Sequence, residues 1–274
     1  MRLLFLLIAV LVGASSSNAS PGFMGSCLDA PVSSEPEITV IAVLGALGLP
    51  GVRTSANCQR AEEMLAGRNS LDLSKRGIQD LSPLRSLTGF KLLNLSGNRI
   101  ERVDGVSDLR DLAVLILSKN PLRTLDGIES LTLLKELEIQ DSKISDLSRL
   151  KGLRELRTLN LAENAIADLR PLEKLDHVQH LDLTSNKVKS VASLVALRNL
   201  QLLRVAKNKI GDFKRLTLLE NGHYDDEGRW IQLSIEGRHE QAGPPVSPPP
   251  KPEPPPGPCP DPDEEPLPDC PCGC

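Results

Sequence analysis

LNLSGNRI at residues 93–100 and LILSKNPL at residues 115–122 are two copies of one pattern, Leu-x-Leu-x-x-Asn-x-Ile or Leu, placed 22 residues apart. Counting in steps of 22 in both directions finds seven copies without an insertion or deletion. They start at Leu71, Leu93, Leu115, Leu137, Leu159, Leu181 and Leu203. A fixed period of this length predicts a solenoid in which every repeat supplies one short strand and one short helical return.

Each repeat has an inner and an outer side. Leu93 and Leu95 alternate with polar residues, so both leucines point to one face of a short strand. Further along, apolar residues recur about every third position, as in Leu81, Leu84 and Leu87, which suits a 3₁₀ or short α-helical return. One repeat is too small to bury this stripe alone. We therefore expect neighbouring repeats to stack and share one core.

A column of asparagines, represented by Asn98 and Asn120, follows the strands. Where the chain turns away from a strand, backbone groups lose their sheet partners, and burying each without a hydrogen bond costs about 1–3 kcal/mol. An asparagine amide both donates and accepts, so it can satisfy groups on adjacent turns. Arg76 and Ser142 interrupt the column, and Ser142 marks the least regular repeat.

The string Ile-x-Asp-Leu-x-Pro-Leu at residues 78–84, with echoes at 144–150 and 166–172, resembles the 22-residue class of leucine-rich repeats. That class includes bacterial internalins and the leucine-rich regulatory subunits of protein phosphatases. The resemblance covers residues 70–220 as seven repeats. It implies an α/β solenoid, a right-handed horseshoe with a parallel concave β-sheet, a helical N-terminal cap at residues 20–69 and a short C-terminal cap at residues 221–243. It says little about the ligand, because fold does not determine function.

The first 19 residues have the form of a signal peptide. Arg2 precedes an apolar run at residues 3–12, and Ser17-Asn18-Ala19 is an acceptable cleavage site. The run is too short for a transmembrane helix, which takes about 20 residues. A second apolar stretch at residues 38–49 is also too short and is interpreted as a core helix of the cap. We expect a secreted, periplasmic or cell-surface protein, of bacterial origin by its resemblance, that is not transmembrane.

The cysteines form two groups, Cys27 with Cys58 near the start and four more near the end. Export favours disulfides, so Cys27 and Cys58 are predicted to pair around the cap, a bond worth about 3–4 kcal/mol in the loop-entropy model. Two unrelated thiols, or a lipid-modified Cys27, are the weaker alternatives.

The C-terminal stretch at residues 244–274 contains 15 of the 22 prolines and is acidic, which predicts an extended or disordered tail. Its cysteines can form local disulfides, an intermolecular crosslink or a soft-metal site. Alternating cysteines fit the usual zinc spacing poorly, so a disulfide or crosslink is favoured and no metal is expected. The tail cysteines are Cys259, Cys270, Cys272 and Cys274.

No motif in the sequence indicates an enzyme. There is no Gly-x-Ser-x-Gly elbow, phosphate-binding loop or His-Glu-x-x-His, and the four histidines have no set of ligating partners. Aromatic residues make up only 2% and the net charge is −4, which argues against nucleic-acid binding. We expect no catalytic residues, no cofactor and no nucleic-acid partner.

The outward positions of the strands are the candidate binding residues. Three apolar residues occupy positions where solvent exposure is expected, and acidic residues follow them on the next repeats. An apolar cluster bordered by charge is typical of an interface. We predict a protein or peptide partner with basic and apolar groups, although the cap or the tail could instead cover the apolar cluster. The candidate residues are Leu92, Val114, Ile116, Glu136, Glu138, Asp141, Glu163, His180, Asp182 and Arg204.

Three functional hypotheses follow. The first is an exported, non-enzymatic module that binds a protein or peptide on its concave sheet face. The second is a structural envelope or surface protein, tethered or crosslinked through the Pro-rich tail, with a disulfide-linked multimer as one form. The third, ranked last, is a metal-handling protein that uses the four tail cysteines.

Overall fold

The computed structural model describes residues 22–216, 220, 223–224, 230–231 and 233–236. The predicted signal peptide at residues 1–19 and the predicted tail at residues 244–274 lie outside the described residues, as do Cys259, Cys270, Cys272 and Cys274. The predicted C-terminal cap at residues 221–243 is described only in part.

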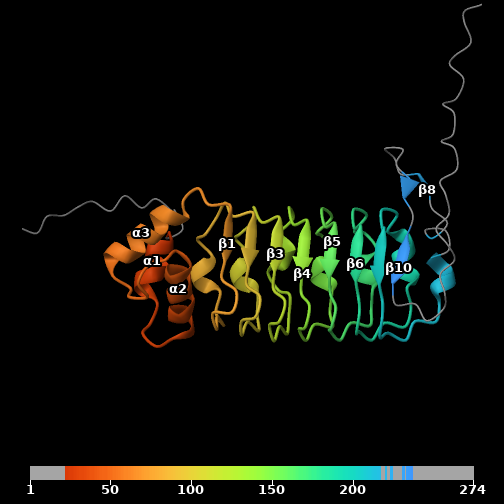
Figure 1. Ribbon diagram of the computed structural model, residues 1–274, viewed down its shortest axis with the longest axis horizontal. Coiled ribbons are helices and arrows are strands. Elements are labelled where there is room, and N and C mark those ends of the chain that lie inside the picture. The colour runs from red at the N-terminus through yellow and green to blue at the C-terminus, as the bar shows by residue number, and fades with distance from the viewer. Residues whose placement is uncertain (1–21, 217–219, 221–222, 225–229, 232, 237–274) are drawn as a thin grey trace, which may run out of the picture.

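A single parallel sheet runs the length of the solenoid (Figure 1). Its order is β1-β2-β3-β4-β5-β6-β7-β10, and paired strands align in register, as in Leu71 opposite Leu93 and Leu93 opposite Leu115. Residues 22 apart in the sequence therefore lie opposite each other on adjacent strands. The periodic strands are β1 (Ser70–Asp72), β2 (Leu92–Asn94), β3 (Val114–Ile116), β4 (Glu136–Glu138), β5 (Thr158–Asn160), β6 (His180–Asp182) and β7 (Leu202–Arg204).

The returns between strands are 3₁₀ helices rather than α-helices. Leu84 N–H donates to Leu81 O and Leu87 N–H donates to Leu84 O, both at 2.9 Å, so the three-residue apolar step matches the hydrogen-bond step. The returns are η1 (Ser82–Leu84), η2 (Asp104–Val106), η3 (Ile128–Ser130), η4 (Ser148–Leu150), η5 (Arg170–Leu172), η6 (Ala192–Ala196) and η7 (Phe213–Leu216).

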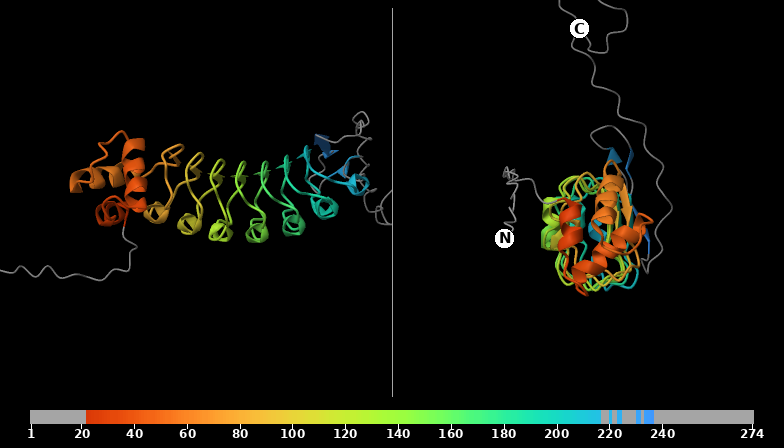
Figure 2. Two further views of the ribbon diagram at one scale, coloured as in Figure 1. Left: turned by 90° about the horizontal axis from the view of Figure 1, so that it is seen from below. Right: turned by 90° about the vertical axis from the view of Figure 1, so that its left-hand side faces the viewer.

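The core lies between the sheet and the returns. The middle residue of each periodic strand is buried, as are Leu81, Leu84 and their equivalents on later turns, except Phe213 on the last turn, which is partly buried. Figure 2 shows the solenoid bowing gently, with the strands on its inner side and the 3₁₀ helices on its outer side. The predicted leucine-rich solenoid with a parallel concave sheet is confirmed.

The asparagine column connects adjacent turns as predicted. Asn120 Oδ1 accepts from Ile100 N–H at 3.1 Å, and its Nδ2 donates to Leu95 O at 2.9 Å and Leu117 O at 2.8 Å. Asn98, Asn164, Asn186 and Asn208 repeat this arrangement on their own turns. At the interruption, the buried Ser142 hydroxyl has no hydrogen-bond partner among the described residues.

The N-terminal end is covered by three helices, and the second contains most of the apolar stretch at residues 38–49. They are α1 (Phe23–Asp29), α2 (Glu35–Ala46) and α3 (Ser55–Leu65) (Figure 1). α1 and α2 pack against η1 in the first turn of the solenoid, and α3 packs against α1 and α2. Pro36 near the start of α2 and the Ser34 and Thr54 side chains, which accept from backbone N–H groups, explain where α2 and α3 begin.

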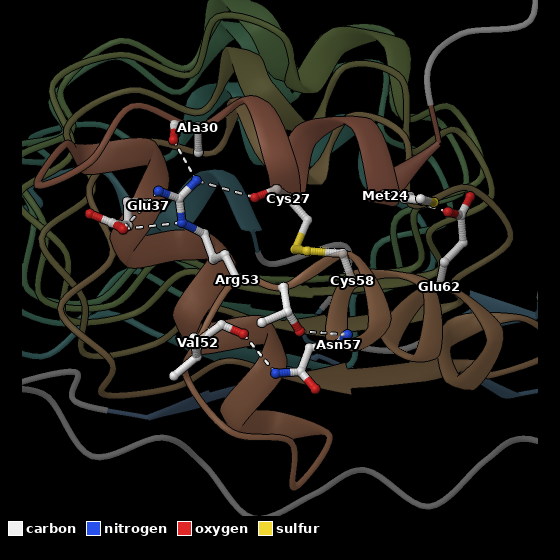
Figure 3. The surroundings of a disulfide bond; sticks show 10 residues. Met24, Cys27, Ala30, Glu37, Val52, Arg53, Asn57, Cys58 and Glu62 are labelled. Atoms are coloured by element: carbon white, nitrogen blue, oxygen red, sulfur yellow. Dashed lines mark hydrogen bonds and ion pairs between the residues drawn. A yellow bond between two sulfur atoms is a disulfide. The ribbon is translucent and has the colours of Figure 1, made fainter.

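Cys27 of α1 and Cys58 of α3 form a disulfide with their Cα atoms 5.8 Å apart, and both are fully buried (Figure 3). The bond therefore joins the first and third of these helices. Arg53 holds the same region together: its guanidinium donates to the Cys27 and Ala30 carbonyls and pairs with Glu37 at 2.9 Å. The disulfide and the Arg53 contacts therefore hold the three helices of the cap together.

The C-terminal end contains three short strands, although the alternation of residues 230–235 predicts one continuous strand. The chain forms a small antiparallel pair, β8 (His223–Tyr224) with β9 (Trp230–Ile231), and then a separate strand β10 (Ser234–Glu236). β10 joins the main sheet parallel to β7, with Ile235 opposite Leu203. An eighth strand thus extends the sheet although it does not follow the 22-residue period.

Candidate protein-binding surface on the sheet

Two rows of side chains project from the solvent side of the sheet, one from the first and one from the third residue of each strand. We call this surface the sheet face. In register, the first row reads Ser70, Leu92, Val114, Glu136, Thr158, His180, Leu202 and Ser234, and the third row reads Asp72, Asn94, Ile116, Glu138, Asn160, Asp182, Arg204 and Glu236.

The three apolar candidates form one contiguous cluster. Leu92 pairs with Val114 across β2 and β3, and Ile116 lies two residues along β3 on the same face. All three are only partly buried, whereas the middle residues Leu93 and Leu115 are buried in the core. The cluster is therefore a partly exposed apolar surface on the concave side.

Glu136 and Glu138 border this cluster directly. Val114 is in register with Glu136 and Ile116 with Glu138, so each carboxylate lies one strand away from an apolar side chain. Burial raises the pKa of Glu138, and the negative charge of Glu136 raises it further. Both causes make the ionised Glu138 unfavourable where it lies, and a cation placed beside it would relieve this.

Asp141 and Glu163 lie beyond the strands, at the rim of the sheet face. Both have left-handed backbone with φ of 54° and 57°, and both side chains are exposed. The same left-handed corner recurs after the other strands, with Gly97 in place of a side chain after β2. Gln140 Nε2 donates to Glu163 Oε1 at 3.2 Å, which connects the two acidic turns. The acidic band predicted from the sequence thus extends from β4 over the rim.

Asp182 has a structural contact in addition to its place on the sheet face. Its Oδ1 accepts from Thr184 N–H at 2.8 Å, and Asp72, Asn94 and Asn160 hold the N–H two residues further on in the same way. The hydrogen bond from Ser74 N–H accordingly lowers the pKa of Asp72. Third-row Asp and Asn residues therefore stabilise the turn at the end of their strand.

Arg204, a candidate binding residue, is paired with an acidic residue on the neighbouring strand. Its Nε lies 2.7 Å from Glu236 Oε2 on β10, and this hydrogen-bonded pairing raises the pKa of Arg204. Glu236 could not be recognised from the sequence, because β10 lies outside the 22-residue period. His180 is exposed at the first position of β6, within the same strand as Asp182.

Metal-binding clusters and membrane-spanning helices are both absent from the described residues. Within residues 22–216 and the short described segments after them, no group of three or more His, Cys, Asp or Glu side chains is arranged to hold a metal ion. No helix in the described part of the chain is long and apolar enough to cross a membrane.

The fold and the repeat define a leucine-rich repeat protein. A family model described as "Leucine Rich repeats (2 copies)" matches residues 154–195, which contain β5, β6 and their returns. The chain is a leucine-rich repeat protein, and proteins of this kind generally act in protein–protein interaction. A comparison with curated proteins finds no match.

Solved structures similar to this one include two internalins of Listeria monocytogenes. The chain is 31% identical to internalin InlF over 56% of its own length and 46% of that chain, with a TM-score of 0.54. It is 24% identical to internalin C2 over 74% of its length and 95% of that chain, also with a TM-score of 0.54. A leucine-rich repeat protein of Leptospira interrogans is 23% identical over 55% of this chain and 46% of that one, with a TM-score of 0.50. The chain spans less than half of InlF and of the Leptospira protein, and the two matches below 25% identity support the fold alone.

Proposed function

We propose that this protein is an exported, non-enzymatic module that binds a protein or peptide partner on the sheet face. The observation that carries the proposal is the apolar cluster of Leu92, Val114 and Ile116, which is partly exposed and lies in register against Glu136 and Glu138. An apolar cluster bordered by charge is the arrangement found in protein interfaces.

The dimensions of the sheet favour an extended or folded polypeptide over a small molecule. Adjacent strands lie about 4.8 Å apart, so the eight-stranded sheet extends over roughly 34 Å. A shallow surface of this length suits a protein interface, whereas small ligands are usually enclosed in a pocket.

The charges on the sheet face specify the kind of partner. A lysine or arginine of the partner near Glu138 would offset the burial and the repulsion from Glu136 that raise its pKa. An apolar side chain beside it would cover Ile116, one strand away. Asp141 and Glu163 at the rim would chiefly increase the rate of association and select basic partners. Export is supported by the signal-like residues 1–19 and by the Cys27–Cys58 bond, because disulfides are rare in the cytosol.

The proposal is tested by selecting random displayed peptides on the purified protein and measuring the affinity of the enriched peptides for three variants. Ile116→Ser and Glu138→Lys change the sheet face, and Asp176→Lys makes the same kind of charge reversal at an exposed position in the return after η5. We expect the peptides to combine basic and apolar residues. Their affinity should fall at least about tenfold, or ~1.4 kcal/mol, for the two sheet-face variants, with Asp176→Lys unchanged.

Equal affinity for all three variants would place the binding site away from the sheet face. A loss of affinity that accompanies a loss of thermal stability would show a folding defect instead, so the melting temperature of each variant is measured in parallel. The structural hypothesis, with tethering or crosslinking through the Pro-rich tail, stays a prediction. Covalent multimers on non-reducing electrophoresis that disappear when Cys259, Cys270, Cys272 and Cys274 are changed to serine would favour it.

A further inference from the structure

Four exposed lysines gather on the last two periodic turns, and we call them the lysine patch: Lys187, Lys189, Lys207 and Lys209. Val188 and Asn208 point inward between the members of each pair, so both lysines of a pair project outward. Lys209 N–H donates to Val188 O at 3.0 Å and Gly211 N–H donates to Lys189 O at 3.2 Å, so the two turns lie in direct contact. Lys187 is in register with Lys209 on the next turn, about 4.8 Å away along the sheet, whereas Lys207 is in register with Ser185 and Lys189 with Gly211. The four lysines therefore lie along the same stretch of two adjacent turns, just after the strands.

No carboxylate of the described residues neutralises this patch. None of the four lysines lies within ion-pair distance of an Asp or Glu in the described part of the chain, while Arg85, Arg123 and Arg149 each pair with an acidic residue on a neighbouring turn.

The acidic residue nearest in sequence is already engaged. Asp212 accepts from the Ser190 hydroxyl at 2.6 Å and from Val191 N–H at 2.9 Å, and it pairs with Arg215 at 3.3 Å. The lysine patch therefore carries unbalanced positive charge in a chain whose net charge is −4.

We propose that the lysine patch docks the acidic run of this chain's own C-terminal segment, Asp261-Pro262-Asp263-Glu264-Glu265. Four carboxylates within five residues match four ammonium groups on two adjacent turns. The charges of the two regions also support this docking, because the C-terminal segment is acidic and the last turns of the solenoid are basic.

The path of the chain brings the two groups within reach. β10 ends at Glu236 and pairs with β7, the strand that leads into Lys207 and Lys209. The 25 residues from Glu236 to Asp261 reach up to about 80 Å when extended, far more than the few turns to be crossed. Because the segment is covalently attached, its effective concentration at the patch is on the order of millimolar.

Such docking would be weak in each contact and sensitive to salt. Exposed ion pairs contribute about 0–1 kcal/mol each, and they are screened as ionic strength rises. Docking would hold Cys270, Cys272 and Cys274, which follow the acidic run closely, beside the end of the solenoid. This inference does not depend on what binds the sheet face.

The test uses the full chain and measures the rate at which each lysine is acetylated by a small reagent, read by mass spectrometry. A variant with Asp261→Asn, Asp263→Asn, Glu264→Gln and Glu265→Gln removes the proposed occupant without touching the solenoid. We expect acetylation of the four patch lysines to rise about threefold or more in this variant at low salt, as for loss of a weakly docked segment. Lys75, Lys119, Lys143 and Lys151, which are exposed elsewhere on the solenoid, should be unaffected and serve as the control.

Zero-length carbodiimide crosslinking of a mixture of ¹⁴N- and ¹⁵N-labelled chains identifies the occupant. Crosslinks from residues 261–265 to the patch within one isotope, lost at high salt, would support the proposal. Mixed-isotope crosslinks would overturn it in favour of docking onto a second copy. Acetylation unchanged by the tail variant, or crosslinks spread evenly over all lysines, would overturn it and leave an external anion as the ligand of the patch.

Discussion

Replacing Ser142 with asparagine should complete the asparagine column at its interruption in the middle of the solenoid. In the regular repeats the asparagine accepts from an N–H twenty residues earlier and donates to two carbonyls, as Asn164 does to Ile139 O and Leu161 O. At position 142 the corresponding groups are Leu122 N–H, Leu117 O and Ile139 O. Leu122 N–H instead donates to Asn120 O at 2.8 Å, and the Ser142 hydroxyl has no partner among the described residues.

The expected gain in stability depends on which backbone carbonyls accept from only one asparagine amide and can accept from a second. Leu95 O, Leu161 O and Leu183 O each accept from two asparagine amides. Leu117 O and Ile139 O each accept from one, at 2.8 Å and 2.7 Å. Two new donations at about 1 kcal/mol each predict a gain of about 2 kcal/mol. Leu122 N–H only exchanges one acceptor for another, so it adds little.

The assay is urea unfolding followed by circular dichroism, with Ser142→Ala as the matched control. Alanine removes the buried hydroxyl without adding a hydrogen bond, so the difference between the asparagine and alanine variants isolates the new contacts. In a domain of this size, about 2 kcal/mol corresponds to a rise in melting temperature of roughly 4–8 °C. Ser142→Asn no more stable than Ser142→Ala would refute the reasoning, because it would show that the open carbonyls cannot be reached.

Two other predictions concern packing and charge. A Cβ on Gly105 would lie 2.5 Å from Leu81 Cβ and 2.6 Å from Leu81 C, so Gly105→Ala should destabilise the protein by about 1–3 kcal/mol. Gly152→Ala, with nothing within 4 Å of the added Cβ, should stay within about 0.5 kcal/mol of wild type in the same denaturation experiment. The raised pKa of Glu138 means that the folded protein binds its proton more tightly than the unfolded chain does, so this carboxyl lowers stability as pH rises through the raised pKa. Glu138→Gln should therefore unfold at higher urea concentration than wild type at pH about 7 and show no advantage below the unfolded pKa of about 4.3; an advantage that persists at low pH would contradict this assignment.

Most of the solenoid could be predicted because its constraints are local and repeated. Leu93 and Leu95 alternate within one strand, and the same columns recur every 22 residues, so one correct repeat fixes the others. Features that occur once were harder to predict. The short helix α1 has little apolar periodicity in its seven residues, and β10 joins the sheet 32 residues after β7 instead of 22, so no periodic pattern reveals it.

The candidate site was predictable in its positions but only partly in its chemistry. Counting outward positions placed Ile116 beside Glu138 correctly, since register follows from the period. The same counting could not show that Arg204 is paired with Glu236, because that contact comes from the non-periodic strand. Counting also could not show that Asp182 accepts from Thr184 N–H. The sequence does not tell whether an Asp side chain binds a partner or the backbone of its own strand.

Some third-row residues of the sheet face make structural contacts and others do not, and this difference indicates which of them can bind a partner. Asp72, Asn94, Asn160 and Asp182 are each held by an N–H two residues further on, so changing them would also disturb the end of a strand. Arg204 is held by Glu236. Ile116 and Glu138 remain, on adjacent strands, and the N–H of Gln140 that follows Glu138 donates to the Ser118 hydroxyl at 3.1 Å instead. Because the Ser118 hydroxyl accepts from Gln140 N–H, the Glu138 side chain is not needed for that hydrogen bond. Position 138 can therefore carry a partly buried carboxylate beside an apolar side chain. This pair costs the folded protein some stability, and binding a basic and apolar partner is the role that would offset this cost.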